Sequence, residues 1–106
     1  LRLVGSQMSI RVSDKAIKES KPTLVVFLHH GGQDVVEVKY ITDDVKSKYG
    51  DKANIVRADD PYGKLKVEYK LEEYPTYILF KEGQELMRES GRKTESELSE
   101  MINTAL

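Results

Sequence analysis

The sequence predicts one α/β domain, in which four helices pack against a central mixed β-sheet of four to five strands. Two observations predict this fold class. Short β-branched segments alternate with amphipathic segments along residues 1–106, as in strands joined by helical crossovers. A tight turn, instead of a helix, separates the last two strand-like segments, which predicts an antiparallel hairpin at one edge of the sheet.

The first predicted strand covers residues 8–12, where apolar and polar side chains alternate. This period of two is typical of a strand with one buried face. Ser13 follows in a position suited to an N-cap, and good helix formers come after it. We therefore expect a helix of about two turns that ends near Ser20.

A second interpretation of the N-terminal segment remains open. Residues 1–4 could form the strand and Ser6 could cap a longer helix. Three apolar residues at helical spacing favour this alternative: Met8, Val12 and Ala16. Residues 1–7 can also be interpreted as a cloning remnant or a disordered leader.

A continuous apolar run over residues 23–28 follows Pro22 and predicts a central strand that is buried on both faces. The next amphipathic segment runs from Asp34 to the stop at Gly50. Asp34 and Glu37 have the spacing of a capping box. The predicted buried stripe of this long helix has helical spacing and comprises Val35, Val38, Ile41 or Thr42, Val45 and Tyr49.

A third strand is predicted over residues 53–58. Asp60 then stands as an N-cap before Pro61, which opens a helix towards Tyr69. The rings of three tyrosines at helical positions are expected to pack inward with their hydroxyls at the surface: Tyr40, Tyr49 and Tyr69.

The C-terminal part predicts a hairpin followed by a helix. Strands over residues 76–81 and 85–89 flank a turn at residues 82–84. Thr94 and Glu97 form a second capping box. The buried stripe of the last helix is predicted to contain Leu98, Met101, Ile102 and Ala105.

Charge and composition exclude several classes of function. Seventeen basic and eighteen acidic side chains are interspersed, so no single-sign field favours nucleic acid or an anionic membrane. The apolar runs are too short to cross a bilayer, which predicts a soluble protein. The absence of cysteine leaves the compartment open: a cytoplasmic protein is favoured, and a secreted or periplasmic one fits if a signal peptide has been removed.

The order of predicted elements, together with a few local motifs, resembles the thioredoxin family over nearly all of the chain. The motifs are Lys-Pro-Thr-Leu-Val-Val-Phe at residues 21–27, Pro75-Thr76, the turn after Phe80 and a glycine, Gly91, before the last helix. The resemblance implies a three-layer α/β/α fold. It also implies that the Tyr74-Pro75 bond is cis and that the flanking backbone faces the active site.

The resemblance further shows what this chain lacks. The Cys-x-x-Cys motif of the family falls on residues 32–35, Gly-Gln-Asp-Val. Thiol–disulfide exchange needs a thiolate and a second, resolving thiol, so the chain cannot carry it out. Val26 and Gly31 stand where the family has a buried acid and a tryptophan. These changes together indicate a natural, redox-inactive relative.

We predict that the former active-site groove binds an extended polypeptide or a partner protein, as cysteine-free domains of protein disulfide isomerases do. A monomer or a weak homodimer is expected, with no nucleic acid, membrane insertion, metal or cofactor. The predicted binding residues belong to the loop and to the segments that face it. They are His29, His30, Gly31, Gly32, Gln33, Asp34, Val35, Tyr62, Tyr74, Pro75, Thr76, Gly91 and Arg92.

An alternative function uses the two adjacent histidines, His29 and His30. Histidine titrates near neutrality and a carboxylate such as Asp34 can orient it, which would suit acid–base catalysis. A metal site is the other form of this alternative. However, successive side chains that leave a strand point to opposite faces, whereas a transition metal needs three or four converging ligands.

Overall fold

The computed structural model describes residues 20–29, 31–32 and 35–106. The strand predicted over residues 8–12, the helix predicted to end near Ser20, their alternative and the leader at residues 1–7 lie outside the described residues, apart from Ser20 itself. The described part contains four strands and three α-helices. The fourth predicted helix is therefore not among the described elements.

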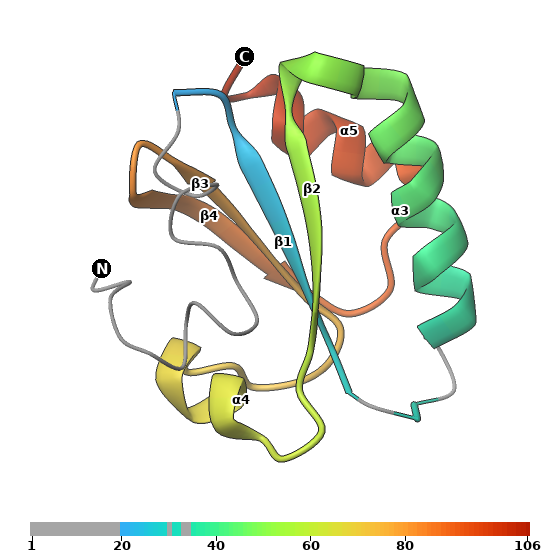
Figure 1. Cartoon of the computed structure of the whole chain (residues 1–106), viewed down its shortest axis with the longest axis vertical. Helices are drawn as coiled ribbons and strands as arrows, with labels where there is room; N and C mark the ends of the chain where they lie inside the picture. Colours follow the sequence, from blue (N-terminus) through green and yellow to red (C-terminus); the bar gives the residue numbers. More distant parts are fainter. Residues whose placement is uncertain (1–19, 30, 33–34) are drawn as a thin grey trace.

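The four strands form one mixed sheet in the order β2-β1-β3-β4 (Figure 1). They are β1 (Thr23–Leu28), β2 (Asn54–Asp59), β3 (Thr76–Lys81) and β4 (Gln84–Ser90). β1 is parallel to β2 and antiparallel to β3, and β3 is antiparallel to β4. The predicted hairpin and the mixed character of the sheet are confirmed.

Helices cover both faces of this sheet, which makes three layers. The helices α3 (Val35–Tyr49) and α5 (Glu95–Asn103) lie on one face, and α4 (Lys64–Tyr69) lies on the other (Figure 1). A short 3₁₀ turn, η1 (Gly50–Lys52), follows α3. The α/β/α fold class implied by the sequence is confirmed.

All six residues of β1 are buried, because its side chains alternate between two hydrophobic cores. Leu24, Val26 and Leu28 face the core under α3 and α5. Val25 and Phe27 face the core under α4. The prediction of a central strand buried on both faces is confirmed, and β1 becomes the rigid element from which the loop at residue 29 begins.

The predicted helix stripes are confirmed, whereas two expectations for the tyrosines are wrong. The Tyr69 ring packs inward as expected, but its hydroxyl is buried and not at the surface. Val38, Thr42, Val45 and Tyr49 of α3 are buried, and so are Leu98, Met101 and Ile102 of α5. Thr94 and Glu97 form the predicted capping box. The expectation that Tyr40 packs inward is wrong, since the residue is 69% exposed: it lies two residues from both Val38 and Thr42 and therefore on the opposite side of the helix.

Candidate functional site

Four strand ends bring the predicted site residues to one end of the sheet. Leu28 at the end of β1 is aligned with Asp59 at the end of β2. On the other side of β1, Phe27 is aligned with Thr76 at the start of β3, which in turn is aligned with Ser90 at the end of β4. Segments that follow or precede these residues must therefore meet at the same sheet edge.

The loop after β1 is held by its own backbone. The Gly32 N–H donates to the His29 carbonyl at 3.0 Å, and the Val35 N–H donates to the Gly32 carbonyl at 3.3 Å. Gly31 has a φ of 76°, in the left-handed region that suits glycine. His29 and Gly31 are exposed, whereas Val35, the first residue of α3, is half-buried. Three predicted site residues, His30, Gln33 and Asp34, lie outside the described residues.

The segment before β3 faces this loop, and its backbone is anchored. The Tyr74-Pro75 bond is cis, as the resemblance implies. The Pro75 carbonyl accepts a 2.9 Å hydrogen bond from the Gly91 N–H. The Thr76 hydroxyl donates to the Glu73 carbonyl at 2.5 Å and lies 3.2 Å from the Ser90 hydroxyl. Tyr74, Pro75, Thr76 and Gly91 are thus brought together.

A buried carboxylate, Asp60, joins this segment to α4. Asp60 is only 2% exposed. One of its oxygens accepts from the Leu65 N–H at 3.1 Å, and the other accepts from the Lys66 N–H at 2.8 Å and from the Tyr74 hydroxyl at 2.7 Å. The Asp60 N–H donates to the Leu28 carbonyl at 3.0 Å. Asp60 therefore connects β1, α4 and Tyr74.

The prediction that Asp60 is the N-cap residue, with Pro61 as the first helical residue, is wrong in position. The helix begins at Lys64, and Gly63 occupies the N-cap position with a φ of 72°. Because the intervening turn folds back, the Asp60 carboxylate still reaches two N–H groups at the start of the helix. Asp60 thus accepts hydrogen bonds from the first N–H groups of the helix, although it lies three residues before the N-cap position.

The Tyr74 side chain contacts both the loop and α4. Its ring centroid lies 5.3 Å from that of His29 in a tilted arrangement, and the Lys66 ammonium lies 5.8 Å from the ring centroid. Burial raises the pKa of the Tyr74 phenol above its usual range, and the hydrogen bond and negative charge of Asp60 act in the same direction. The hydroxyl therefore stays protonated as a hydrogen-bond donor at neutral pH.

Two other predicted site residues interact with other parts of the chain. Arg92 forms an ion pair with Glu37 in the first turn of α3, so it joins the loop after β4 to that helix. Tyr62 is 81% exposed and lines a separate shallow pocket on α4. In the described part of the chain, no hydrogen bond or ring contact joins Tyr62 to Tyr74 or His29.

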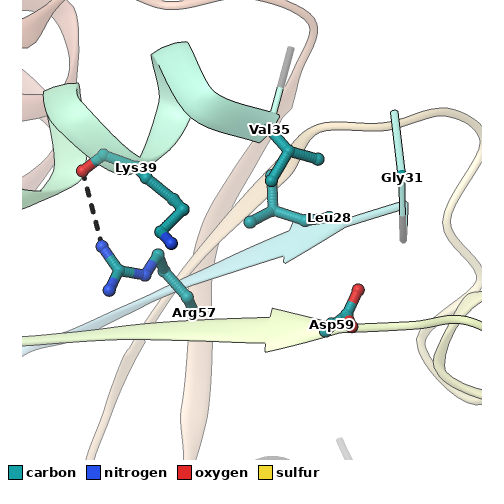
Figure 2. Close-up of a pocket in the computed structure, with 6 residues that line it drawn as sticks. All are labelled: Leu28, Gly31, Val35, Lys39, Arg57 and Asp59. Carbon is teal, nitrogen blue, oxygen red and sulfur yellow. Dashed lines mark hydrogen bonds between the residues drawn. The ribbon is translucent and has the colours of Figure 1, made fainter. Parts of the chain in front are cut away.

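A pocket beside the loop involves residues that sequence reasoning did not single out. The cavity has a volume of about 340 Å³ and lies between α3 and the ends of β1 and β2 (Figure 2). Its lining consists of Leu28, Gly31, Val35, Lys39, Arg57 and Asp59. Only Gly31 and Val35 were predicted as site residues. The others could not be found from the sequence, because they become neighbours only through the pairing of β1 with β2.

The described residues contain no group of three or more histidine, cysteine or acidic side chains that could hold a metal ion. The metal alternative for His29 and His30 is not tested by this observation, since His30 and Asp34 are outside the described ranges. Over the same ranges, no helix has both the length and the apolar character needed to cross a bilayer.

Comparison with curated proteins finds plant thioredoxins. The chain is 30% identical over 108 residues to a protein named Thioredoxin Y, chloroplastic, from Oryza sativa subsp. japonica, with 100% of this chain and 64% of the relative covered. It is 32% identical over 97 residues to Thioredoxin X, chloroplastic, from Arabidopsis thaliana, with 89% and 53% covered. The chain thus spans less than two thirds of either relative. No family model matches the sequence.

Solved structures share the fold at lower identity. Thioredoxin-2, described as a component of malaria parasite protein secretion machinery, superposes with a TM-score of 0.72 and 20% identity, covering 79% of this chain and 82% of its own. A second malarial protein gives a TM-score of 0.71 and 21% identity, covering 81% of this chain and 98% of its own. These similarities establish the architecture of the described domain.

Proposed function

We propose that this chain, a thioredoxin-like domain without the Cys-x-x-Cys motif, binds an extended polypeptide segment of a partner protein and does not react with it. The observation that carries the proposal is the anchored segment from Tyr74 to Thr76. Gly91, Glu73 and Asp60 hold it beside the loop that begins at His29.

The absence of thiols excludes the exchange reaction, but polypeptide binding does not need a thiol. Mixed-disulfide formation requires a thiolate, and the 106 residues contain no cysteine. Recognition of an extended chain requires instead backbone groups in a defined position and pockets for alternate side chains. The hydrogen bonds at Pro75 and Thr76 supply the defined position. The rings of His29 and Tyr74, which lie against each other, supply an apolar and partly exposed surface.

The proposal is tested by titrating ¹⁵N-labelled protein with capped, cysteine-free peptides rich in Val and Thr, which favour extended conformations. We expect the largest shifts at the amides of His29, Gly31, Tyr74, Thr76 and Gly91. Shifts confined to a remote surface, such as the exposed side of α5, would refute groove binding.

One variant distinguishes polypeptide binding from the competing function, an enzyme or metal site at the two histidines. His29→Ala with His30→Ala removes both imidazoles, and Tyr40→Ala serves as a control at an exposed ring on α3. A polypeptide binder should lose about threefold in affinity, as for the loss of one partly exposed ring contact. Nickel or zinc binding by calorimetry that disappears in the double variant would favour the alternative instead.

A further inference from the structure

Two cationic side chains from different elements meet at the pocket beside the loop. Lys39 extends from α3 towards Arg57 on β2 (Figure 2). Both line the same cavity of about 340 Å³. Like charges held close together repel each other, and a bound anion would relieve that repulsion. This arrangement favours a negatively charged group in the pocket.

Arg57 is oriented so that part of its guanidinium remains available. Its Nη1 donates to the Asp43 carboxylate at 2.7 Å, to the Thr42 hydroxyl at 3.3 Å and to the Lys39 carbonyl at 3.4 Å. These three contacts hold one end of the guanidinium against α3. Neither Nε nor Nη2 forms a hydrogen bond or ion pair with the described residues. A planar cation held at one end, with N–H groups available at the other, suits a carboxylate.

The Lys39 ammonium adds a mobile charge. It makes no hydrogen bond or ion pair with the described residues, although the Lys39 backbone accepts from Arg57. Lysine is a flexible point charge that can follow an anion. One of the two cations is therefore pre-oriented, and the other can adapt to the ligand.

The other residues that line the pocket indicate which chemical group the carboxylate is attached to. Leu28 is 6% exposed and Val35 is half-buried, so the wall near the loop is apolar. Asp59 and Gly31 lie at the other end of the pocket from Lys39 and Arg57 (Figure 2). An aliphatic stem would contact the apolar wall. A glutamate side chain combines such a stem with a carboxylate.

We propose that this pocket binds the carboxylate of a glutamate side chain in the polypeptide held at the groove, so that the site selects acidic segments. The inference rests on the proposed function, because Gly31 and Val35 belong both to the pocket and to the predicted binding loop. Asp43 forms an ion pair with Arg57 and offsets part of its charge. Lys39 is therefore the main determinant of the preference.

The test uses two capped, Val- and Thr-rich peptides that differ only in a central Glu or Gln. Affinities are measured by NMR titration for the wild type, for Lys39→Gln and for Lys46→Gln. Lys46 is an exposed residue of the same helix that does not line the pocket, so it controls for net charge. We expect the wild type to prefer the Glu peptide by about fivefold, with the preference lost in Lys39→Gln and kept in Lys46→Gln.

Two further measurements identify the source of the preference. A Gln peptide with a free C-terminal carboxylate should bind no better than the same peptide with a capped C-terminus. The NMR signal of the Arg57 side-chain Nε–H should shift only when the Glu peptide is added. The preference for the Glu peptide should also decrease when the salt concentration is raised from about 0.05 to 0.5 M, because salt screens partly exposed charges.

The outcomes separate this inference from the proposed function. Equal binding of both peptides at the groove, or a Glu preference that survives in Lys39→Gln, overturns the carboxylate pocket and leaves polypeptide binding in place. A C-terminal carboxylate that binds as well as Glu overturns the assignment to a side chain. Absence of any groove shift overturns both the proposed function and this inference.

Discussion

The two sides of the candidate site differ in how they are held. The segment from Glu73 to Thr76 is tied by hydrogen bonds to the loop after β4 and to the buried Asp60 carboxylate. The loop from His29 to Val35 is held in its described part by two local backbone hydrogen bonds, and its His29 side chain is exposed. The first side is held by hydrogen bonds to distant parts of the chain, whereas these two backbone hydrogen bonds of the described loop residues stay within the loop's own turn.

This difference shows which part of the site would depend on thiols. The resemblance to thioredoxins implies that Gly32 and Val35 stand where the family has cysteines, with Val26 and Gly31 at two supporting positions. The opposite side uses main-chain groups and a carboxylate–phenol hydrogen bond, which do not depend on thiols. Reactive side chains can thus be absent while the backbone arrangement beside them is kept.

The largest expected effect comes from returning thiols to the loop. A Cβ atom at Gly32 would lie 3.8 Å from Cγ2 of Val35 and 3.2 Å from the His29 carbonyl oxygen. The side chains at positions 32 and 35 would thus be in van der Waals contact, so Gly32→Cys with Val35→Cys should close an intramolecular disulfide, with a small shift at the His29 carbonyl. Insulin reduction should change from none to detectable, yet remain roughly a hundredfold below that of a thioredoxin with its buried acid.

The matched control for that variant is Gly31→Cys with Val35→Cys. A Cβ at Gly31 meets nothing within 4 Å, so this pair should remain as two thiols in a titration with a thiol reagent. If the Gly31 pair closes and the Gly32 pair does not, the loop does not hold residues 32 and 35 as the structure describes.

Removal of the Asp60 carboxylate should destabilise the anchored side most. Asp60→Ala leaves the N–H groups of Leu65 and Lys66 and the Tyr74 hydroxyl without their acceptor. We expect the free energy of unfolding to fall by about 3 kcal/mol, as measured by urea denaturation. Asp44→Ala, at an exposed position of α3, should change it by less than about 0.5 kcal/mol. Equal losses in the two variants would contradict the role of Asp60.

A smaller effect is expected from removing only the Tyr74 hydroxyl. Tyr74→Phe keeps the ring against His29 and deletes one hydrogen bond to Asp60, which should cost about 1 kcal/mol at pH 7. Tyr62→Phe is the control, since that residue is 81% exposed, and it should leave the free energy of unfolding unchanged.

The same variant tests the pKa of Tyr74 through the pH dependence of stability. The folded state raises the pKa of this phenol, so its contribution is fully present below the unfolded value of about 10. The contribution is lost as the pH rises further, because the unfolded chain releases the proton first. The stability difference between wild type and Tyr74→Phe should therefore shrink above pH 10. A constant difference would show that the hydroxyl has no raised pKa.

The regular elements of the described chain were largely predictable, because local patterns determine them. The apolar run of β1, the stripe of α3 and the Thr94–Glu97 capping box all agree with the structure. Errors occurred where local sequence was ambiguous. The Asp60-Pro61 pair suggested a helix start, but the turn that follows postpones the helix to Lys64. Tyr40 was assigned to the core although its position on α3 faces solvent.

Sequence by itself determined that this chain has no thiol for exchange, and that its strands and helices follow one another in an α/β order. Only the tertiary structure decided that Asp60 meets Tyr74 and that Lys39 meets Arg57 beside the loop. The physical reason is the range of the forces involved. Hydrophobic periodicity and capping act within a few residues, whereas the site consists of contacts between segments that become neighbours only when β1 pairs with β2 and β3.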